Sequence, residues 1–165
     1  MKINKVVVGE LQTNCYVLEK DNKCIVIDPG DEYDKINEVI SDNKVVGVIV
    51  THYHFDHIGS LNNFNKNLIL DSSNLDEKEY NIDNFKFEVI YTPGHKEDAI
   101  TIYFKDEMVM FTGDFIFKGA IGRMDLPGGN YNDMLNSLNK LRKYDKDIKI
   151  YPGHGDSTYL KHEID

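Results

Sequence analysis

The chain has 165 residues, 41% of them hydrophobic and 28% charged, which predicts one folded domain over residues 1–165 and excludes a disordered polypeptide. Its net charge of −9 at pH 7 argues against nucleic acid and anionic membrane surfaces as partners. The N-terminus carries only a three-residue apolar run, too short for a secretory signal or a membrane span, so we expect a cytoplasmic location.

Short β-rich runs dominate the chain, and no internal repeat or low-complexity linker separates them. Runs of this length, rich in β-branched and aromatic residues and bounded by turn residues, are typical of strands. We predict strands at residues 5–8, 15–18, 24–27, 45–50, 68–70, 85–91, 99–104, 108–111 and 148–151.

Apolar residues at helical spacing mark three further stretches. The first covers residues 33–40, with Asp31 as its predicted N-cap. The second begins near His57, and the third covers residues 134–141 after a predicted cap at Asn132. Strands and helices alternate unevenly, which favours layered sheets covered by helices over a doubly wound parallel sheet.

The two cysteines, Cys15 and Cys24, form no C-x-x-C pair, and each lies in a predicted strand. We therefore expect buried free thiols rather than a disulfide. Neither has a histidine nearby in sequence, so covalent catalysis by a cysteine is the less favoured interpretation.

Three of the six histidines fall in the stretch THYHFDH at residues 51–57, directly after a predicted strand. In an extended segment His52 and His54 point the same way, whereas Asp56 and His57 begin a predicted helix and project in other directions. One loop can then supply two adjacent metal positions. Neutral imidazole and carboxylate suit zinc, and the same ligands accept iron or manganese.

Three more candidate ligands, His95, Asp114 and His154, each follow an apolar strand and a glycine. The glycine allows the sharp turn that brings the ligand close to a site. A lone histidine after a turn is more often a surface or core residue than a ligand. The repetition of this context predicts that four strand ends converge on one metal site. His162 lies in a polar tail, and we assign it no function.

These motifs resemble those of the metallo-β-lactamase superfamily and, within it, of the small glyoxalase II-like (hydroxyacylglutathione hydrolase-like) hydrolases. The resemblance implies an α/β (α+β) fold, a four-layer αββα sandwich of two mixed sheets with helices outside. The matching segments run through most of the chain: NCY at 14–16, DPG at 28–30, THYHFDH at 51–57, TPGH at 92–95, TGD at 112–114, GRMDLPGG at 122–129 and PGHG at 152–155.

The resemblance also implies a site for two divalent metal ions, zinc in the first place, with iron or manganese as alternatives. It assigns three residues to the first ion, three to the second, and one carboxylate to both. The first ion would be held by His52, His54 and His95, the second by Asp56, His57 and His154, and Asp114 would bridge them.

The implied reaction is the hydrolysis of a thioester by a metal-bridging hydroxide, with Asp114 and Asp56 as catalytic residues. The substrate would be a small molecule such as S-lactoylglutathione or a related acyl-thiol. The sequence ends soon after His154, so we expect no helical domain of the kind that binds glutathione in full-length glyoxalase II, and the thiol carrier stays open. The sequence predicts no oligomeric state.

Other interpretations differ in the chemistry that they predict. A persulfide dioxygenase-like enzyme shares nearly every motif but uses a single iron, so metal content separates it from a hydrolase. A lactonase or another ester hydrolase of the superfamily would use the same ligands. A β-lactamase is less favoured because those enzymes usually lack a carboxylate at the bridging position of Asp114, and a nuclease because the chain is acidic. A non-catalytic binding module would have little reason to keep seven ligand-type residues.

Four residues near the motifs have roles that the sequence leaves open. Arg123 is a candidate contact for an anionic substrate, and Tyr53 is a candidate substrate contact or a packing residue. Asp28 either orients a ligand or only shapes the Asp-Pro-Gly turn, so we leave it outside the predicted site. Asp98 stands, together with Ala99, where many relatives have a Gly-Ser pair, and a serine hydrogen bond is therefore lost.

Overall fold

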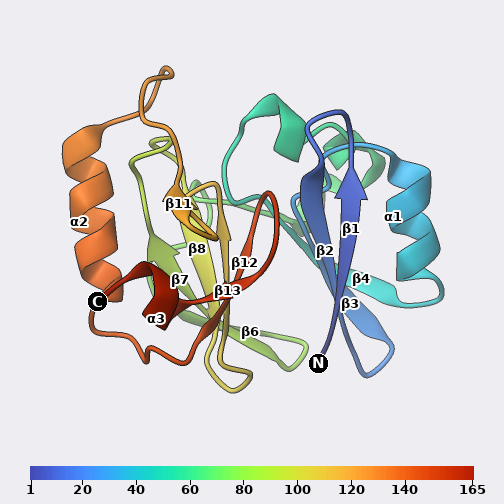
Figure 1. Ribbon diagram of the computed structural model, residues 1–165. Coiled ribbons are helices and arrows are strands. Elements are labelled where there is room, and N and C mark those ends of the chain that lie inside the picture. Colours follow the sequence, from blue (N-terminus) through green and yellow to red (C-terminus); the bar gives the residue numbers. More distant parts are fainter.

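Two β-sheets lie face to face in the computed structural model, which describes residues 1–165, and helices cover their outer sides (Figure 1). The first sheet has five strands in the order β1-β2-β3-β4-β5. Its strands are β1 (Lys2–Val8), β2 (Thr13–Lys20), β3 (Lys23–Ile27), β4 (Lys44–Ile49) and β5 (Ile69–Leu70).

The second sheet has six strands in the order β13-β12-β9-β8-β7-β6. Its strands are β6 (Glu79–Ile82), β7 (Phe85–Tyr91), β8 (Ile100–Phe104), β9 (Val109–Gly113), β12 (Lys149–Pro152) and β13 (Thr158–Tyr159). A small hairpin of β10 (Ile116–Phe117) and β11 (Ala120–Ile121) follows β9. The helices are α1 (Tyr33–Ile40), α2 (Tyr131–Leu141) and α3 (Leu160–Glu163).

Strand alternation explains why the molecule has four layers. Along β2, Tyr16 and Leu18 belong to the core between the two sheets, whereas Cys15 and Val17 belong to the core beneath α1. Successive side chains of a strand face opposite sides of the sheet, so one apolar strand contributes to two cores. A third core joins the second sheet to α2 and α3. The expected αββα sandwich is therefore observed.

All nine predicted strands are present, with ends displaced by up to three residues. The strands absent from the prediction are β6, β10, β11 and β13, which have four residues or fewer. Such short segments contain too few residues to show a period of two.

The helix predicted from His57 onwards is wrong. Residues Phe55–His57 and Leu61–Asn63 form separate 3-10 turns instead, followed by a third at Lys66–Leu68. The backbone N–H groups of Gly59 and Ser60 donate to the carbonyls of residues 29 and 30, each at 2.9 Å. Because an α-helix needs these donors for its own hydrogen bonds, tertiary contacts interrupt the helical spacing here.

Both predicted helix caps are also displaced. The N-cap of α1 is Glu32, and Asp31 instead accepts a hydrogen bond from the Glu32 backbone N–H at 2.7 Å. The N-cap of α2 is Asn130, whose side chain accepts from the Asp133 N–H at 2.9 Å, so Asn132 lies inside the first turn. Cap geometry depends on backbone conformation, which residue type alone does not fix.

Cys15 and Cys24 are buried free thiols, as predicted. None of the helices is long and apolar enough to cross a membrane.

Candidate metal centre

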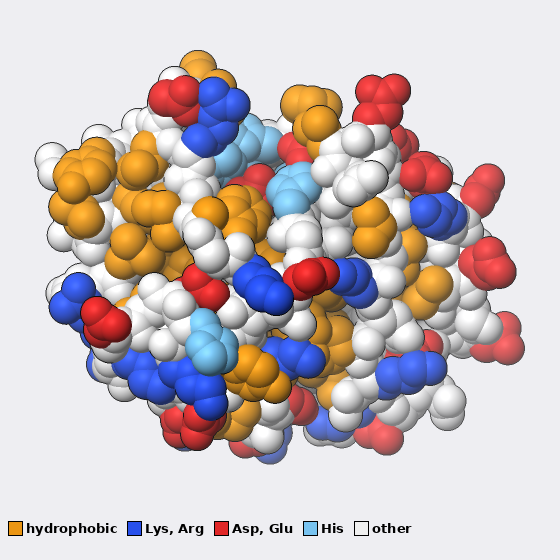
Figure 2. Space-filling view, viewed as in Figure 1, with side chains coloured by type: hydrophobic (Ala, Val, Ile, Leu, Met, Phe, Trp, Pro, Cys, Tyr) orange, Lys and Arg blue, Asp and Glu red, His pale blue; other side chains and the backbone are white.

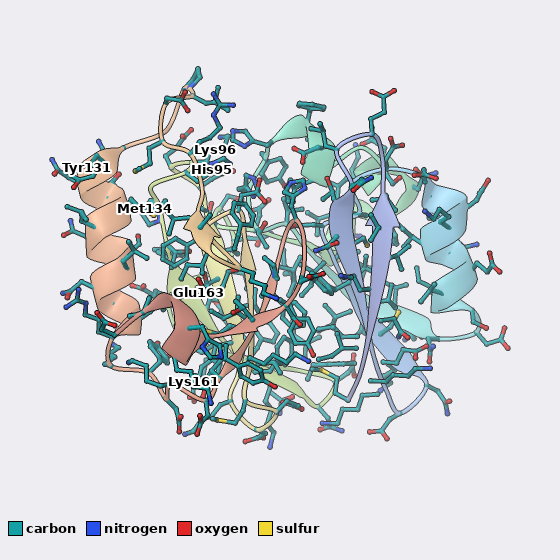
Figure 3. The ribbon with its side chains drawn as sticks, viewed as in Figure 1. His95, Lys96, Tyr131, Met134, Lys161 and Glu163 are labelled. Atoms are coloured by element: carbon teal, nitrogen blue, oxygen red, sulfur yellow. The ribbon has the colours of Figure 1, made fainter.

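The predicted ligands leave the sheets at one common edge. Strands β7 and β9 are each antiparallel to β8, and β9 is parallel to β12, so β7, β9 and β12 run in the same direction. Their carboxyl ends therefore deliver His95, Asp114 and His154 to the same edge. Residues 51–57 approach this edge from the end of β4 in the facing sheet. Figure 2 shows histidine side chains in a hollow at the top of the molecule, between its two halves, and a further histidine on the lower surface; Figure 3 labels His95 in the upper part.

His52, His54 and His95 form the first group of possible ligands, each offering one ring nitrogen within 4.8 Å of the others. Nδ1 of His54 lies 2.9 Å from Nε2 of His95, and the two rings are nearly perpendicular, at 89°. His52 and His95 are buried, and His54 is partly exposed. The extended segment thus places His52 and His54 in one group, as the alternation of its side chains predicts.

Asp56, His57, Asp114 and His154 form the second group, with one atom each within 4.8 Å of the others. Oδ2 of Asp56 lies 3.1 Å from Nε2 of His154 and 3.4 Å from Nε2 of His57. The hydroxyl of Thr13 donates to the same oxygen at 3.0 Å and so holds the Asp56 carboxylate in the site.

Asp114 lies between the two groups. Its Oδ1 is 3.2 Å from Nε2 of His57, and its Oδ2 is 3.5 Å from Nε2 of His154. The same Oδ2 is 3.7 Å from Nε2 of His52 and 3.6 Å from Nε2 of His95. One carboxylate therefore contacts ligand atoms of both groups, which is the placement expected of a bridging ligand.

Three inward-facing atoms have no hydrogen-bond partner although they are fully buried: Nε2 of His52, Nε2 of His57 and Oδ1 of Asp114. Buried polar atoms without a partner are rare because their desolvation is uncompensated. Nitrogen and carboxylate oxygen are also the donors that zinc and iron accept. The residues present thus fit a divalent metal centre in both donor chemistry and orientation.

Hydrogen bonds on the outward side fix four of the five imidazoles. In each, the ring nitrogen that faces away from the site bonds to the surrounding protein at 2.8–3.1 Å, and such bonds set which nitrogen is free to bind a metal. The pairs are His52 with the Thr51 hydroxyl, His57 with the Asp28 carboxylate, His95 with the Arg123 carbonyl and His154 with the Leu11 carbonyl.

Asp28 lies in this supporting layer, although the sequence prediction left it outside the site. Its carboxylate accepts hydrogen bonds from the Thr51 backbone N–H at 2.8 Å and the Thr51 hydroxyl at 2.7 Å, and it contacts Nδ1 of His57 at 2.8 Å. The residue is buried and adopts a positive φ of 54°. The sequence pointed to Asp28 only through the tripeptide Asp-Pro-Gly. The same residues also form turns in which the Asp makes no such contacts.

Close packing requires a glycine at position 153, directly before the predicted ligand His154. A Cβ atom at this position would overlap Oδ1 of Asp114 and lie 2.8 Å from Cε1 of His57. Gly113 directly precedes Asp114 and has a φ of +54°. A Cβ atom at Gly113 would lie 2.9 Å from Cβ of Thr51. The ligands can therefore converge only because these positions carry no side chain.

Burial and neighbouring charges act in opposite directions on the titratable groups of the site. Burial holds the pKa of His52 well below its usual value, so this imidazole is neutral. Burial alone would raise the pKa of Asp114, but contacts with His154 and His57 outweigh it and keep the pKa far below the ordinary range. In the same way, His154 and His57 bring the pKa of Asp56 down to about 2. Both carboxylates are therefore ionised and available to cations.

The two predicted substrate contacts have partners within the protein. The Arg123 guanidinium forms a two-point ion pair with Asp125, at 2.7 and 2.8 Å, and its side chain is exposed. The Tyr53 hydroxyl donates to Asp71, and the Tyr53 backbone N–H donates to Asp98 at 3.0 Å. Neither side chain is brought among the seven predicted ligands, and Arg123 reaches the site only through its carbonyl, which contacts His95.

Known proteins are similar to this chain in sequence and in fold. The family model of the metallo-beta-lactamase superfamily matches residues 8–72 and 70–154. The chain is 33% identical to "Probable metallo-hydrolase YqgX" of Bacillus subtilis (strain 168), over 100% of this chain and 95% of that protein. It is 28% identical to "Hydroxyacylglutathione hydrolase GloC" of Haemophilus influenzae, over 99% of this chain and 95% of that protein.

Two solved structures are similar over nearly their whole length. The BLEG-1 B3 metallo-beta-lactamase superposes with a TM-score of 0.90 and 28% identity, covering 98% of this chain and 96% of that one. TTHA1623 in a di-iron-bound form superposes with a TM-score of 0.85 and 27% identity, covering 97% and 96%. By its sequence, its fold and the donor atoms gathered between its sheets, this chain belongs to the metallo-beta-lactamase superfamily.

Proposed function

We propose that the protein is a metal-dependent hydrolase of thioesters that works with two divalent ions. One observation carries the proposal: buried nitrogen and oxygen atoms, three of them without a hydrogen bond, face inward in two groups with the Asp114 carboxylate between them. We assign His52, His54 and His95 to the first ion, Asp56, His57 and His154 to the second, and Asp114 to both.

Two divalent ions that share a carboxylate lower the pKa of bound water towards neutrality and stabilise negative charge on a carbonyl oxygen. Side chains around the site keep the predicted ligands in position for this chemistry. The hydroxyl of Thr13 orients Asp56 by a 3.0 Å hydrogen bond, which leaves the carboxylate directed at the site. Cys15 and Cys24 have no exposed surface, so neither can act as a nucleophile towards a substrate.

Space for a substrate adjoins the second group. A cavity of about 340 Å³ lies beside Asp56 and Thr13, with the exposed side chains of Leu11 and Phe55 in its wall. A larger cavity, of about 610 Å³, lies against β6, β7 and β8 and is lined by none of the seven predicted ligands. Of these two cavities, only the smaller one adjoins a predicted ligand.

A thioester suits this site because its thiolate leaving group is weakly basic and needs little help from a general acid. The ionised state of Asp56 and Asp114 provides no carboxylic acid that could protonate a more basic leaving group. The similar protein of Haemophilus influenzae is named for the hydrolysis of hydroxyacylglutathione, which is a thioester. Zinc is our first choice of ion and iron the alternative, since a similar solved structure holds two irons.

The proposal is tested by measuring metal content together with activity on S-lactoylglutathione, a neutral thioester such as S-acetyl-N-acetylcysteamine, a lactone, a β-lactam and a persulfide. We expect two ions per chain and thioester hydrolysis that a chelator abolishes and added zinc restores. A chain that contains a single iron and consumes oxygen with a persulfide would overturn the proposal in favour of a dioxygenase. Hydrolysis of the lactone or the β-lactam without the thioesters would overturn the assigned substrate class.

A further inference from the structure

His54 is the one predicted ligand imidazole without a hydrogen bond on its outward side. Its Nδ1 faces His95, and its Nε2 contacts no protein donor or acceptor. The other four imidazoles are each fixed by such a bond. The position of His54 therefore depends on the backbone that carries it.

Asp98 holds the backbone directly before His54. Oδ2 of Asp98 accepts a hydrogen bond from the Tyr53 backbone N–H at 3.0 Å. Two residues after Asp98, the Ile100 N–H donates at 2.9 Å to the carbonyl of Thr51, which lies two residues before Tyr53. These two hydrogen bonds join the segment of His54 to the segment of His95, although the segments lie more than 40 residues apart in sequence.

The Asp98 carboxylate is itself held in place. Its Oδ1 is buried, makes no hydrogen bond and lies 3.4 Å from Nζ of Lys96, which also contacts Oε1 of Glu97 at 3.2 Å. Figure 3 shows Lys96 next to His95 at the upper edge of the molecule. Asp98 does not adopt a left-handed conformation, so its role is not to relieve strain in the turn. Its short side chain instead reaches a backbone N–H that no other group satisfies.

We propose that Asp98 is a positioning residue of the first metal group: by accepting the Tyr53 N–H, it holds the segment of His54 against the segment of His95, so that the two imidazoles face the same site. That the two imidazoles bind a metal ion rests on the proposed function. The hydrogen bond from the Tyr53 N–H to Asp98 does not depend on it. Supporting contacts of this kind change metal affinity by about 10- to 100-fold when they are removed.

The test compares Asp98→Ala, which removes the acceptor, with Asp98→Asn, which keeps a side-chain oxygen but removes the charge. Glu97→Ala is the matched control, because Glu97 lies in the same turn and contacts Lys96 without touching the segment of His54. Zinc per chain is measured after gel filtration, and affinity by competition with a chelator. We expect Asp98→Ala to retain one ion and to bind the other about 10- to 100-fold more weakly. Asp98→Asn and Glu97→Ala should retain both.

A second measurement does not depend on metal. In the metal-free protein, hydrogen exchange of the Tyr53 amide should accelerate in Asp98→Ala and stay unchanged in Glu97→Ala, while the melting temperature shows that both variants fold. Unchanged exchange in Asp98→Ala, or full retention of both ions with unchanged affinity, would overturn the proposal. Failure of Asp98→Asn to retain both ions would also overturn it. If the natural protein bound no metal, the proposed function would fail, and the exchange measurement would still decide whether Asp98 positions Tyr53.

Discussion

Oδ2 of Asp28 lies 2.8 Å from Nδ1 of His57, and this contact directs the opposite ring nitrogen of His57 towards Asp114. Burial alone would lower the pKa of His57, but the carboxylates of Asp28 and Asp114 raise it well above its ordinary value. In the metal-free protein this imidazole is therefore protonated on both ring nitrogens, and an ion must displace the Nε2 proton to bind there.

Replacing Asp28 by Asn should weaken binding of the second ion by about 10- to 100-fold, because the amide no longer offers His57 a charged acceptor. Asn is the suitable substitution since it tolerates the positive φ of this position better than most residues. Chelator competition gives the affinity. Asp34→Ala on the first turn of α1 is the control and should bind metal like the natural protein. Equal affinities in Asp28→Asn and the control would contradict the role given to Asp28.

Asp114→Ala should reduce thioester turnover by at least about 100-fold, since it removes the carboxylate that lies between the two groups of ligands. The fold should persist, because none of the three apolar cores includes this side chain. Steady-state kinetics measure the activity, and circular dichroism measures the fold. Asp106→Ala in an exposed turn serves as the control. Full activity in a folded Asp114→Ala protein would rule out a bridging role.

Gly153→Ala should damage the metal centre although the substitution adds one methyl group. The new Cβ would overlap Asp114 and press on the His57 ring, so both ligands must move. We expect at least about a tenfold loss of activity and weaker metal binding. Gly47→Ala is the control, because its Cβ would make only an ordinary contact with Leu70 at 3.5 Å, and its stability should change by about 1 kcal/mol or less. Equal behaviour of the two variants in metal titration would contradict the close packing at Gly153.

The thiols of Cys15 and Cys24 should resist alkylation in the folded protein. Burial raises the pKa of the Cys24 thiol to about 11 and that of Cys15 well above its ordinary range, so at pH 8 neither is a thiolate. Mass spectrometry after iodoacetamide treatment should find both unmodified in native protein and both modified in denaturant. Rapid labelling of native protein at pH 8 would contradict this prediction.

The raised pKa values of the two thiols also predict how the free energy of unfolding changes at alkaline pH. A thiol whose pKa is raised by folding keeps its proton longer in the folded state, so the unfolded state binds fewer protons above pH 9. The free energy of unfolding should therefore fall as the pH rises from about 9 to 11. Denaturant titrations of the natural protein and of a Cys24→Ala variant, which should lose part of this pH dependence, provide the measurement.

Local sequence predicted the strands well and one helix poorly, for physical reasons that particular residues show. The continuous apolar run in β2 reflects burial on both faces of a sheet, which is a local property of the residues. The apolar spacing from His57 onwards also looked helical, but Gly59 and Ser60 give their N–H groups to the loop at residues 29–30. A hydrogen bond to a distant segment leaves no periodic signal in the sequence.

The sequence by itself determined which side chains are predicted to offer ligand atoms, because each predicted ligand follows a strand that ends at a sharp turn. Only the tertiary structure decided which nitrogen of His57 faces the site, that Arg123 contributes its carbonyl while its side chain pairs with Asp125, and that Asp98 holds the segment of His54. The division has one cause: ligand type is a property of a residue, whereas orientation depends on hydrogen bonds from chain segments that meet only when the two sheets pack together.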